Sequence, residues 1–369
     1  MNRRLQALHD AGVSIWLDTL SRELLDTGAF ATLIADSAVT GATSNPTIFG
    51  KAITGSDRYD AQLRDAVASG TRDPQELFFE LALEDVRHAA DLLHPAYEAS
   101  EGRDGFVSFE CTPDLAHDTA ATIEQALELW GRLARPNVMI KVPATAAGVP
   151  AIEELTARGV NVNVTLLFSL RRYDEVIEAY LSGLERRESS GESLAGISSV
   201  ASFFVSRVDT KVDAQLIEES PLRGQIAVAN ADRAYGLYRE RFAGERWERL
   251  GALGARPQRP LWASTGTKNP AYSDVLYVER LIAPDVINTM PEATLRAFGD
   301  HGNVAQTLGN DLDKDWRLLV AASNVGVNLD DITTALEHEG VESFCSSYAE
   351  LLSCIESKLA ALPGVDVAG

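Results

Sequence analysis

Residues 137–145, NVMIKVPAT, have the pattern of a buried β-strand with a lysine near its end. Val138, Met139 and Ile140 form the apolar run, whereas lysine is among the residues that proteins bury least often. Lys141 therefore has two interpretations. Either the strand has ended and the ammonium reaches solvent on its apolar stem, or a dry pocket holds the amine for attack on a carbonyl.

Similar short apolar or β-branched runs recur along the chain and predict eight strands. They cover Val13–Asp18, Ala38–Asn45, Gly105–Glu110, Asn137–Val142, Asn161–Leu167, Ile197–Phe204, Leu261–Thr265 and Val286–Met290. Longer amphipathic stretches between them predict helices over 74–93, 119–133, 170–187, 207–242 and 273–281, with at least two more in 329–362. Strands that alternate with helices indicate a parallel sheet with right-handed crossovers.

Such alternation fits a closed eight-stranded barrel or an open doubly wound sheet. We favour an α/β fold of the (β/α)8 TIM-barrel type, because eight strands can be counted and no G-x-G-x-x-G follows any of them. The segment 46–104 is long for one crossover and predicts extra helices after strand 2. Since no long linker interrupts the chain, we expect residues 1–369 to form a single domain. Helices from about 292–369 would pack outside the barrel or close over one mouth.

Composition narrows the functional classes. A net charge of -21 argues against nucleic acid, which is bound by basic surfaces. The 3 cysteines form no C-x-x-C pair or zinc-like cluster with the 6 histidines, so we expect no metal and a reducing cytoplasmic location. The N-terminus lacks an apolar signal region, and no run of about 18 uncharged apolar residues suggests a membrane span. Composition does not predict the oligomeric state.

In a TIM barrel the C-terminal strand ends meet at the mouth where such enzymes place their chemistry. Each polar residue there is weak evidence alone, because polar groups are common at strand ends. Together, two carboxylates, an amine and several hydrogen-bonding groups indicate a nucleophilic amine with a proton shuttle. The candidates at or just after strand ends are Asp18, Asn45, Glu110, Lys141, Thr165, Ser202, Phe204, Arg207, Ser264 and Lys268.

The chemistry that these groups suggest is Schiff-base catalysis on a ketose. An amine attacks a carbonyl only when neutral, and free lysine has a pKa of about 10.4, so the pocket must disfavour the ammonium. The iminium then withdraws electrons and permits scission between the third and fourth ketose carbons. Asp18 and Glu110 would take the proton from the fourth-carbon hydroxyl and help to expel water during imine formation.

The strand-end motifs resemble those of the transaldolase family. SIWLDTLSRELL, TGATSNPTIF, VSFECTPDLAHDT, NVMIKVPAT, GVNVNVTLLFS and ASFFVSRVD follow the family's order from residue 14 to 209. WASTGTKNPAYSDVLYVE and VINTMP extend the similarity to about residue 291. The long second crossover and ASTGTKNPAYSD resemble the actinomycete type of bacterial branch.

The resemblance implies roles for individual residues. It makes Lys141 the Schiff-base lysine and Asp18 the acid/base of carbon–carbon cleavage. Glu110 and Thr165 would position a water for imine formation and hydrolysis.

It further implies how substrate is held. Asn45, Asn163 and Ser202 would hold the dihydroxyacetone unit, and Phe204 would lie beside the lysine. Arg207 would bind phosphate, for which its planar guanidinium is suited.

The chain departs from the family pattern in strand seven. It has STGTK where a short Ser-x-Arg is common, so Ser264 and Lys268 are the expected phosphate ligands there. Lysine would bind phosphate as a point charge, and the alternative for Lys268 is an ordinary exposed loop lysine. His88, His94 and His117 lie in or near predicted helices and are expected at the surface.

For the reaction, the resemblance implies transfer of dihydroxyacetone from sedoheptulose 7-phosphate to glyceraldehyde 3-phosphate, giving erythrose 4-phosphate and fructose 6-phosphate. No metal or organic cofactor would be needed, because the protonated imine is the electron sink. One alternative is a fructose 6-phosphate aldolase, whose members tend to carry glutamine and tyrosine where this chain has Glu110 and Phe204. The other is a non-catalytic sugar-phosphate binder that kept the barrel.

Overall fold

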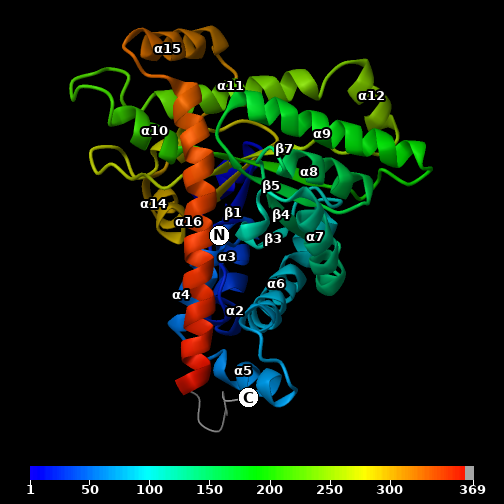
Figure 1. Cartoon of the computed structure of the whole chain (residues 1–369). Coiled ribbons are helices and arrows are strands. Elements are labelled where there is room, and N and C mark those ends of the chain that lie inside the picture. Colours follow the sequence, from blue (N-terminus) through cyan, green and yellow to red (C-terminus); the bar gives the residue numbers. More distant parts are fainter. Residues whose placement is uncertain (362–369) are drawn as a thin grey trace.

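The computed structural model describes residues 1–361, and within them eight parallel strands close into a barrel in sequence order (Figure 1). The closure is made by β1 and β8, which pair in parallel with Leu17 opposite Met290. This confirms the predicted TIM barrel. The strands are β1 Val13–Leu17, β2 Val39–Thr43, β3 Val107–Glu110, β4 Val138–Pro143, β5 Val162–Leu167, β6 Ser199–Phe204, β7 Arg259–Ala263 and β8 Val286–Met290.

Helices surround the barrel and cover its ends. Their bounds are α1 Arg3–Asp10, α2 Arg22–Asp26, α3 Ala29–Ser37, α4 Pro46–Thr54, α5 Asp60–Ala68, α6 Pro74–Ala99, the 3-10 helix η1 Pro113–Leu115, α7 Thr119–Leu133, α8 Gly148–Ala157, α9 Leu170–Ser189, α10 Ser206–Asp213, α11 Ile226–Arg241, α12 Glu245–Ala252, α13 Leu276–Glu279, α14 Glu292–His301, α15 Leu312–Asn324 and α16 Leu329–Ala361. The second crossover holds α4, α5 and α6, as expected. None of the helices in 1–361 is long and apolar enough to cross a bilayer.

Two predicted helices are interrupted or shortened. The stretch 207–242 is two helices, α10 and α11, because Pro221 lacks a backbone N–H and Gly224 takes a left-handed φ of 66° between them. The stretch 273–281 retains only the short helix α13. Its first residue, Ser273, belongs to a turn in which its carbonyl accepts a 2.8 Å hydrogen bond from the Thr267 hydroxyl.

The C-terminal segment differs more from its predicted structure than these two stretches do. At least two helices were expected over 329–362, whereas α16 is one continuous helix of 33 residues. Proline is missing from this segment, and Gly340, the residue that most favours a break, is buried inside the helix. Of the two placements considered, α16 takes the one over a mouth of the barrel (Figure 1). The end of the expected 292–369 segment, residues 362–369, lies outside the described residues.

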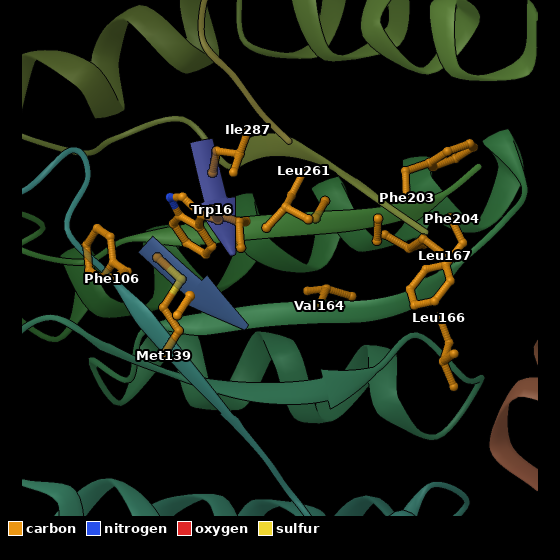
Figure 2. Close-up of a cluster of buried hydrophobic side chains, with 14 of the residues drawn as sticks. Trp16, Phe106, Met139, Val164, Leu166, Leu167, Phe203, Phe204, Leu261 and Ile287 are labelled. Atoms are coloured by element: carbon orange, nitrogen blue, oxygen red, sulfur yellow. The ribbon is translucent and has the colours of Figure 1, made fainter. Parts of the chain in front are cut away.

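Side chains fill the barrel at the end away from α16. Trp16 packs beside Phe106, with ring centroids 6.4 Å apart, and Figure 2 shows Met139 in the same cluster. The indole Nε1 donates a 2.8 Å hydrogen bond to Asp104 Oδ1. Successive strand side chains point to opposite faces, so the alternation that turns Trp16 into the barrel also aims Asp18 at the opposite mouth.

Gly41 makes room for the indole. It lies opposite Trp16 in β2, and a Cβ there would come within 2.5 Å of Trp16 Cε2. We expect Gly41→Ala to lower the free energy of unfolding by about 1–3 kcal/mol, the usual range for overpacking. The urea midpoint measures the change. Gly131→Ala is the matched control, because nothing lies within 4 Å of a Cβ there, and it should leave stability unchanged or raise it. Equal stability of Gly41→Ala and the native chain would contradict the steric argument.

Candidate active site

The strand ends surround a cavity of about 210 Å³ at the mouth beneath α16. Nine of the eleven predicted site residues line it, whereas Glu110 lines a small neighbouring pocket and Asn163 is fully buried. The nine are Asp18, Asn45, Lys141, Thr165, Ser202, Phe204, Arg207, Ser264 and Lys268. Residues that lie far apart in the chain therefore meet because parallel strands end at one edge.

The amine of Lys141 lies inside the barrel mouth. The residue is 5% exposed, and Nζ donates a 3.2 Å hydrogen bond to the carbonyl oxygen of Ser44. Glu110 Oε2 is 3.6 Å from Nζ, an ion-pair distance that is longer than a hydrogen bond. The interpretation in which this side chain simply reaches solvent is therefore wrong.

Glu110 reaches the lysine because β3 and β4 pair with these two residues in register. Its carboxyl is 8% exposed. Burial raises the pKa of Glu110 to about 7, against the opposing charge of Lys141. The group can therefore hold or release a proton close to neutrality.

Asp18 faces the same cavity from the end of β1 and stays partly exposed to it. Its Oδ1 accepts a 2.9 Å hydrogen bond from the Thr43 hydroxyl, which lies 2.7 Å from the hydroxyl of Thr289. Burial raises the pKa of Asp18, while the charge of Lys141 and the Thr43 hydrogen bond oppose that rise. The carboxylate is thus oriented by neutral donors and made a better proton acceptor.

A polar layer lies below and beside the lysine. Ser202 Oγ donates a 2.7 Å hydrogen bond to Asn163 Oδ1, and Asn163 Nδ2 donates to Ser108 Oγ at 2.8 Å. Asn163 is fully buried, so it supports Ser202 from beneath and does not line the cavity. The hydroxyl of Thr165 lines the cavity and has no hydrogen-bond partner among residues 1–361, which leaves it able to bind a ligand or a water.

Asn45 lines the cavity from the start of α4. Its side-chain oxygen accepts a 3.0 Å hydrogen bond from the backbone N–H of Ile48 and so caps that helix. The cap fixes the orientation of the amide, which then presents its NH2 group as the remaining donor.

Two cationic residues besides Lys141 also line the cavity, namely Arg207 and Lys268. The Arg207 guanidinium lies 5.3 Å from the centroid of the Phe204 ring, which packs 5.2 Å from Phe168. Ser264 has a left-handed φ of 56° and its hydroxyl is 2.9 Å from the Ser206 hydroxyl. Lys268 is exposed and also lines the cavity, so its role as a phosphate ligand stays a prediction.

Six cavity residues were missed by reasoning from the sequence, and three of them carry a polar or aromatic side chain. Thr43 and Thr289 are polar residues at strand ends, and the same signal that selected Asp18 could have found them. Phe344 comes from α16, and its ring centroid lies 5.9 Å from Lys141 Nζ. No local sequence motif distinguishes Phe344 from the other apolar residues of this helix.

The histidines set aside earlier, His88, His94 and His117, are exposed, as expected. Within residues 1–361, no three His, Cys, Asp or Glu side chains are grouped so that they could hold a metal ion.

Comparison with known proteins identifies relatives over nearly the whole chain. The family model described as Transaldolase/Fructose-6-phosphate aldolase matches residues 15–355. A protein of Saccharopolyspora erythraea named Transaldolase is 50% identical over 362 residues, which cover 97% of this chain and 98% of that one. A Transaldolase of Thermobifida fusca is 50% identical over 367 residues, 98% of this chain and 100% of its own. Transaldolase 1 of Streptomyces avermitilis is 49% identical over 361 residues, 96% and 95% of the two chains.

Proposed function

The chain belongs to the transaldolase/fructose-6-phosphate aldolase family, and from this premise we propose that it is a transaldolase working through a Schiff base on Lys141. It transfers dihydroxyacetone from sedoheptulose 7-phosphate to glyceraldehyde 3-phosphate, giving erythrose 4-phosphate and fructose 6-phosphate. The observation that carries this proposal is a buried lysine amine that shares one cavity mouth with Asp18 and lies 3.6 Å from Glu110.

Imine formation begins when the neutral amine of Lys141 attacks the ketose carbonyl carbon. The carbon–nitrogen bond forms, and the carbonyl oxygen becomes the hydroxyl of a carbinolamine. Glu110 then gives a proton to that hydroxyl, which leaves as water, and the Thr165 hydroxyl holds the water in line. A carboxyl with a pKa of about 7 suits this step, because it can be protonated before it acts and ionised afterwards.

Cleavage uses the iminium as the electron sink. Asp18 takes the proton from the hydroxyl on the fourth ketose carbon, and the bond between the third and fourth carbons breaks. Its electrons move into the iminium and give an enamine, while the aldehyde half leaves. The acceptor aldehyde then reverses these steps, forming a new carbon–carbon bond and receiving the proton back from Asp18.

Binding residues place the ketose for both steps. Asn45 and Ser202, with Asn163 beneath, are suited to hydrogen bonds with the dihydroxyacetone hydroxyls. Arg207 and Lys268 supply positive charge for the phosphate at the far side of the cavity. That local charge lets a chain with a net charge of -21 bind an anion.

The pH dependence tests the role of Glu110. We expect the single-turnover rate of imine formation to fall as pH rises through about 7, because the proton donor is lost above its pKa. Glu110→Gln should remove this inflection and slow imine formation by about 100-fold. Rapid quenching into borohydride over a pH series measures both. The control variant Glu154→Gln should keep the inflection. If the inflection persists in Glu110→Gln, the proton belongs to another group.

One experiment separates the proposed reaction from its rivals. Borohydride added with fructose 6-phosphate should trap a covalent adduct on Lys141, visible by mass spectrometry. An unmodified protein would favour a non-catalytic binder. Product formed only when erythrose 4-phosphate is present supports the transferase, whereas steady release of dihydroxyacetone without that acceptor would support the aldolase.

The proposal also includes the domain organisation of the chain and its cellular compartment. We expect residues 1–369 to work as one domain, which the packing of α16 across the barrel supports. A cytoplasmic location is consistent with free thiols at Cys111, Cys345 and Cys354.

A further inference from the structure

The long helix α16 is tied down on both sides of the active-site mouth. Near its N-terminal half, Glu337 forms an ion pair with Arg172 of α9 at 3.4 Å, and both side chains are largely buried. Further along, the hydroxyl of Tyr348 donates a 3.1 Å hydrogen bond to Gln75 of α6. Figure 1 shows α16 crossing the molecule as one long helix. The part of the helix between them therefore has a fixed position over the strand ends.

A glycine lets this middle part lie close to the barrel. A Cβ at Gly340 would come within 2.9 Å of Leu166 Cδ2. Leu166 follows Thr165 in β5 and takes a left-handed φ of 58°. A larger side chain at 340 would have to displace the buried Leu166 side chain or move the helix away from the end of β5.

One turn beyond Gly340, Phe344 enters the cavity. The residue is 6% exposed, and its ring centroid is 5.9 Å from Lys141 Nζ. This distance is near the outer limit at which the ring face attracts a cation at the nitrogen, and the ring covers one side of the amine. The imine nitrogen of the covalent intermediate would occupy this place.

We propose that Phe344 shields the Schiff base on Lys141 from water and so decides how much of the enamine is transferred to an aldehyde and how much is hydrolysed. The inference rests on the proposed function. In transfer, the enamine carbon bonds to the carbonyl carbon of the acceptor. In hydrolysis, that carbon takes a proton, water adds to the iminium carbon, the carbon–nitrogen bond breaks, and dihydroxyacetone leaves with the amine restored. Hydrolysis of the iminium that forms from the enamine requires a water to reach the imine carbon while the mouth holds no sugar phosphate. Transfer has no such requirement.

The experiment compares two rates from fructose 6-phosphate: dihydroxyacetone release without acceptor, and transfer to erythrose 4-phosphate. We expect Phe344→Ala to raise the ratio of release to transfer by about tenfold, the scale of a desolvated aromatic–cation contact. Phe344→Met, an apolar side chain of similar size, should stay within about twofold of the native ratio. If Phe344→Met raised the ratio of release to transfer as much as Phe344→Ala, the proposal that the size of the side chain excludes water would be wrong.

A second variant moves the ring without removing it. Gly340→Ala should lift α16 from Leu166 and raise the same ratio with Phe344 intact. Leu351→Ala is the matched control, since Leu351 is a buried residue on the same helix that packs near Gly50 and does not line the cavity. It loosens the helix to a similar degree and should leave the ratio unchanged. A rise in Leu351→Ala equal to that in Phe344→Ala would mean that helix docking alone matters.

Two failures can be told apart. If the native chain gives neither a borohydride-trapped adduct nor acceptor-dependent transfer, the proposed function is wrong. If the native chain does both and Phe344→Ala keeps the native ratio, the function stands and the shielding role is wrong.

Discussion

Replacing Lys141 by methionine is expected to abolish the covalent adduct with fructose 6-phosphate and to lower transfer by about 10⁴-fold or more, the scale of losing a nucleophile. Methionine keeps the apolar stem and the packing volume, so the loss reports the amine itself. Borohydride trapping, mass spectrometry and a coupled transfer assay measure the two effects.

The other lysine of the cavity is the control. Lys268→Met should still give the adduct on Lys141 and should mainly raise KM, by about tenfold if Lys268 contacts phosphate. Thermal melts of both variants establish that they fold. An adduct that persists in Lys141→Met would place the nucleophile elsewhere, and one that disappears in Lys268→Met would exchange the roles of the two lysines.

The second large effect is expected at Asp18. Asp18→Ala should leave imine formation nearly intact and slow carbon–carbon cleavage by at least about 100-fold, the usual cost of a lost general acid/base. The reason is geometric, since the carboxylate is oriented by Thr43 at the cavity wall, whereas Glu110 lies beside the amine. Trapping at short times measures imine formation, and aldehyde release measures cleavage.

A variant of a buried carboxylate at the other end of the barrel is the control. It separates the role of Asp18 in cleavage from a general loss of stability. Asp104→Asn retains an acceptor for the Trp16 indole and should change stability without slowing cleavage. Failure of Asp18→Ala to form any imine would mean that Asp18 serves the earlier step and that the division of labour with Glu110 is misassigned.

Most of the barrel and most of its site could be predicted from short stretches of chain. The strand at 286–290 has the predicted bounds, and the helix at 119–133 does too. In both, periodicity and flanking turns agree, and the Asp118 side chain caps the helix by accepting a hydrogen bond from the backbone N–H of Ala121. Predictions failed where Pro221 and Gly224 were not read as a break, as in 207–242, or where a break was expected, as in 329–362, and α16 runs unbroken to Ala361.

The predicted site residues share a property that explains why they could be found. All of them except Asn163 lie near or beyond the C-terminal end of a strand, so a local pattern and one rule of barrel geometry were enough to gather them. Asn163 lies near the start of β5 and was found only through the family resemblance. Phe344 has no such mark, because it reaches Lys141 only through the path of α16 over the mouth. The depth of Asn163 below Ser202 also depended on how neighbouring strands are staggered.

The sequence alone determined the succession of strands and helices and the direction of each strand side chain, because both follow from repeats of two and about 3.6 residues along the chain. That alternation places Asp18 above Trp16 and Lys141 above Met139 before any contact is known. The tertiary structure alone decided how deeply the Glu110 carboxyl is buried and which ring from the distant helix α16 covers the amine. Those properties depend on packing between segments far apart in the chain, and no local repeat encodes them.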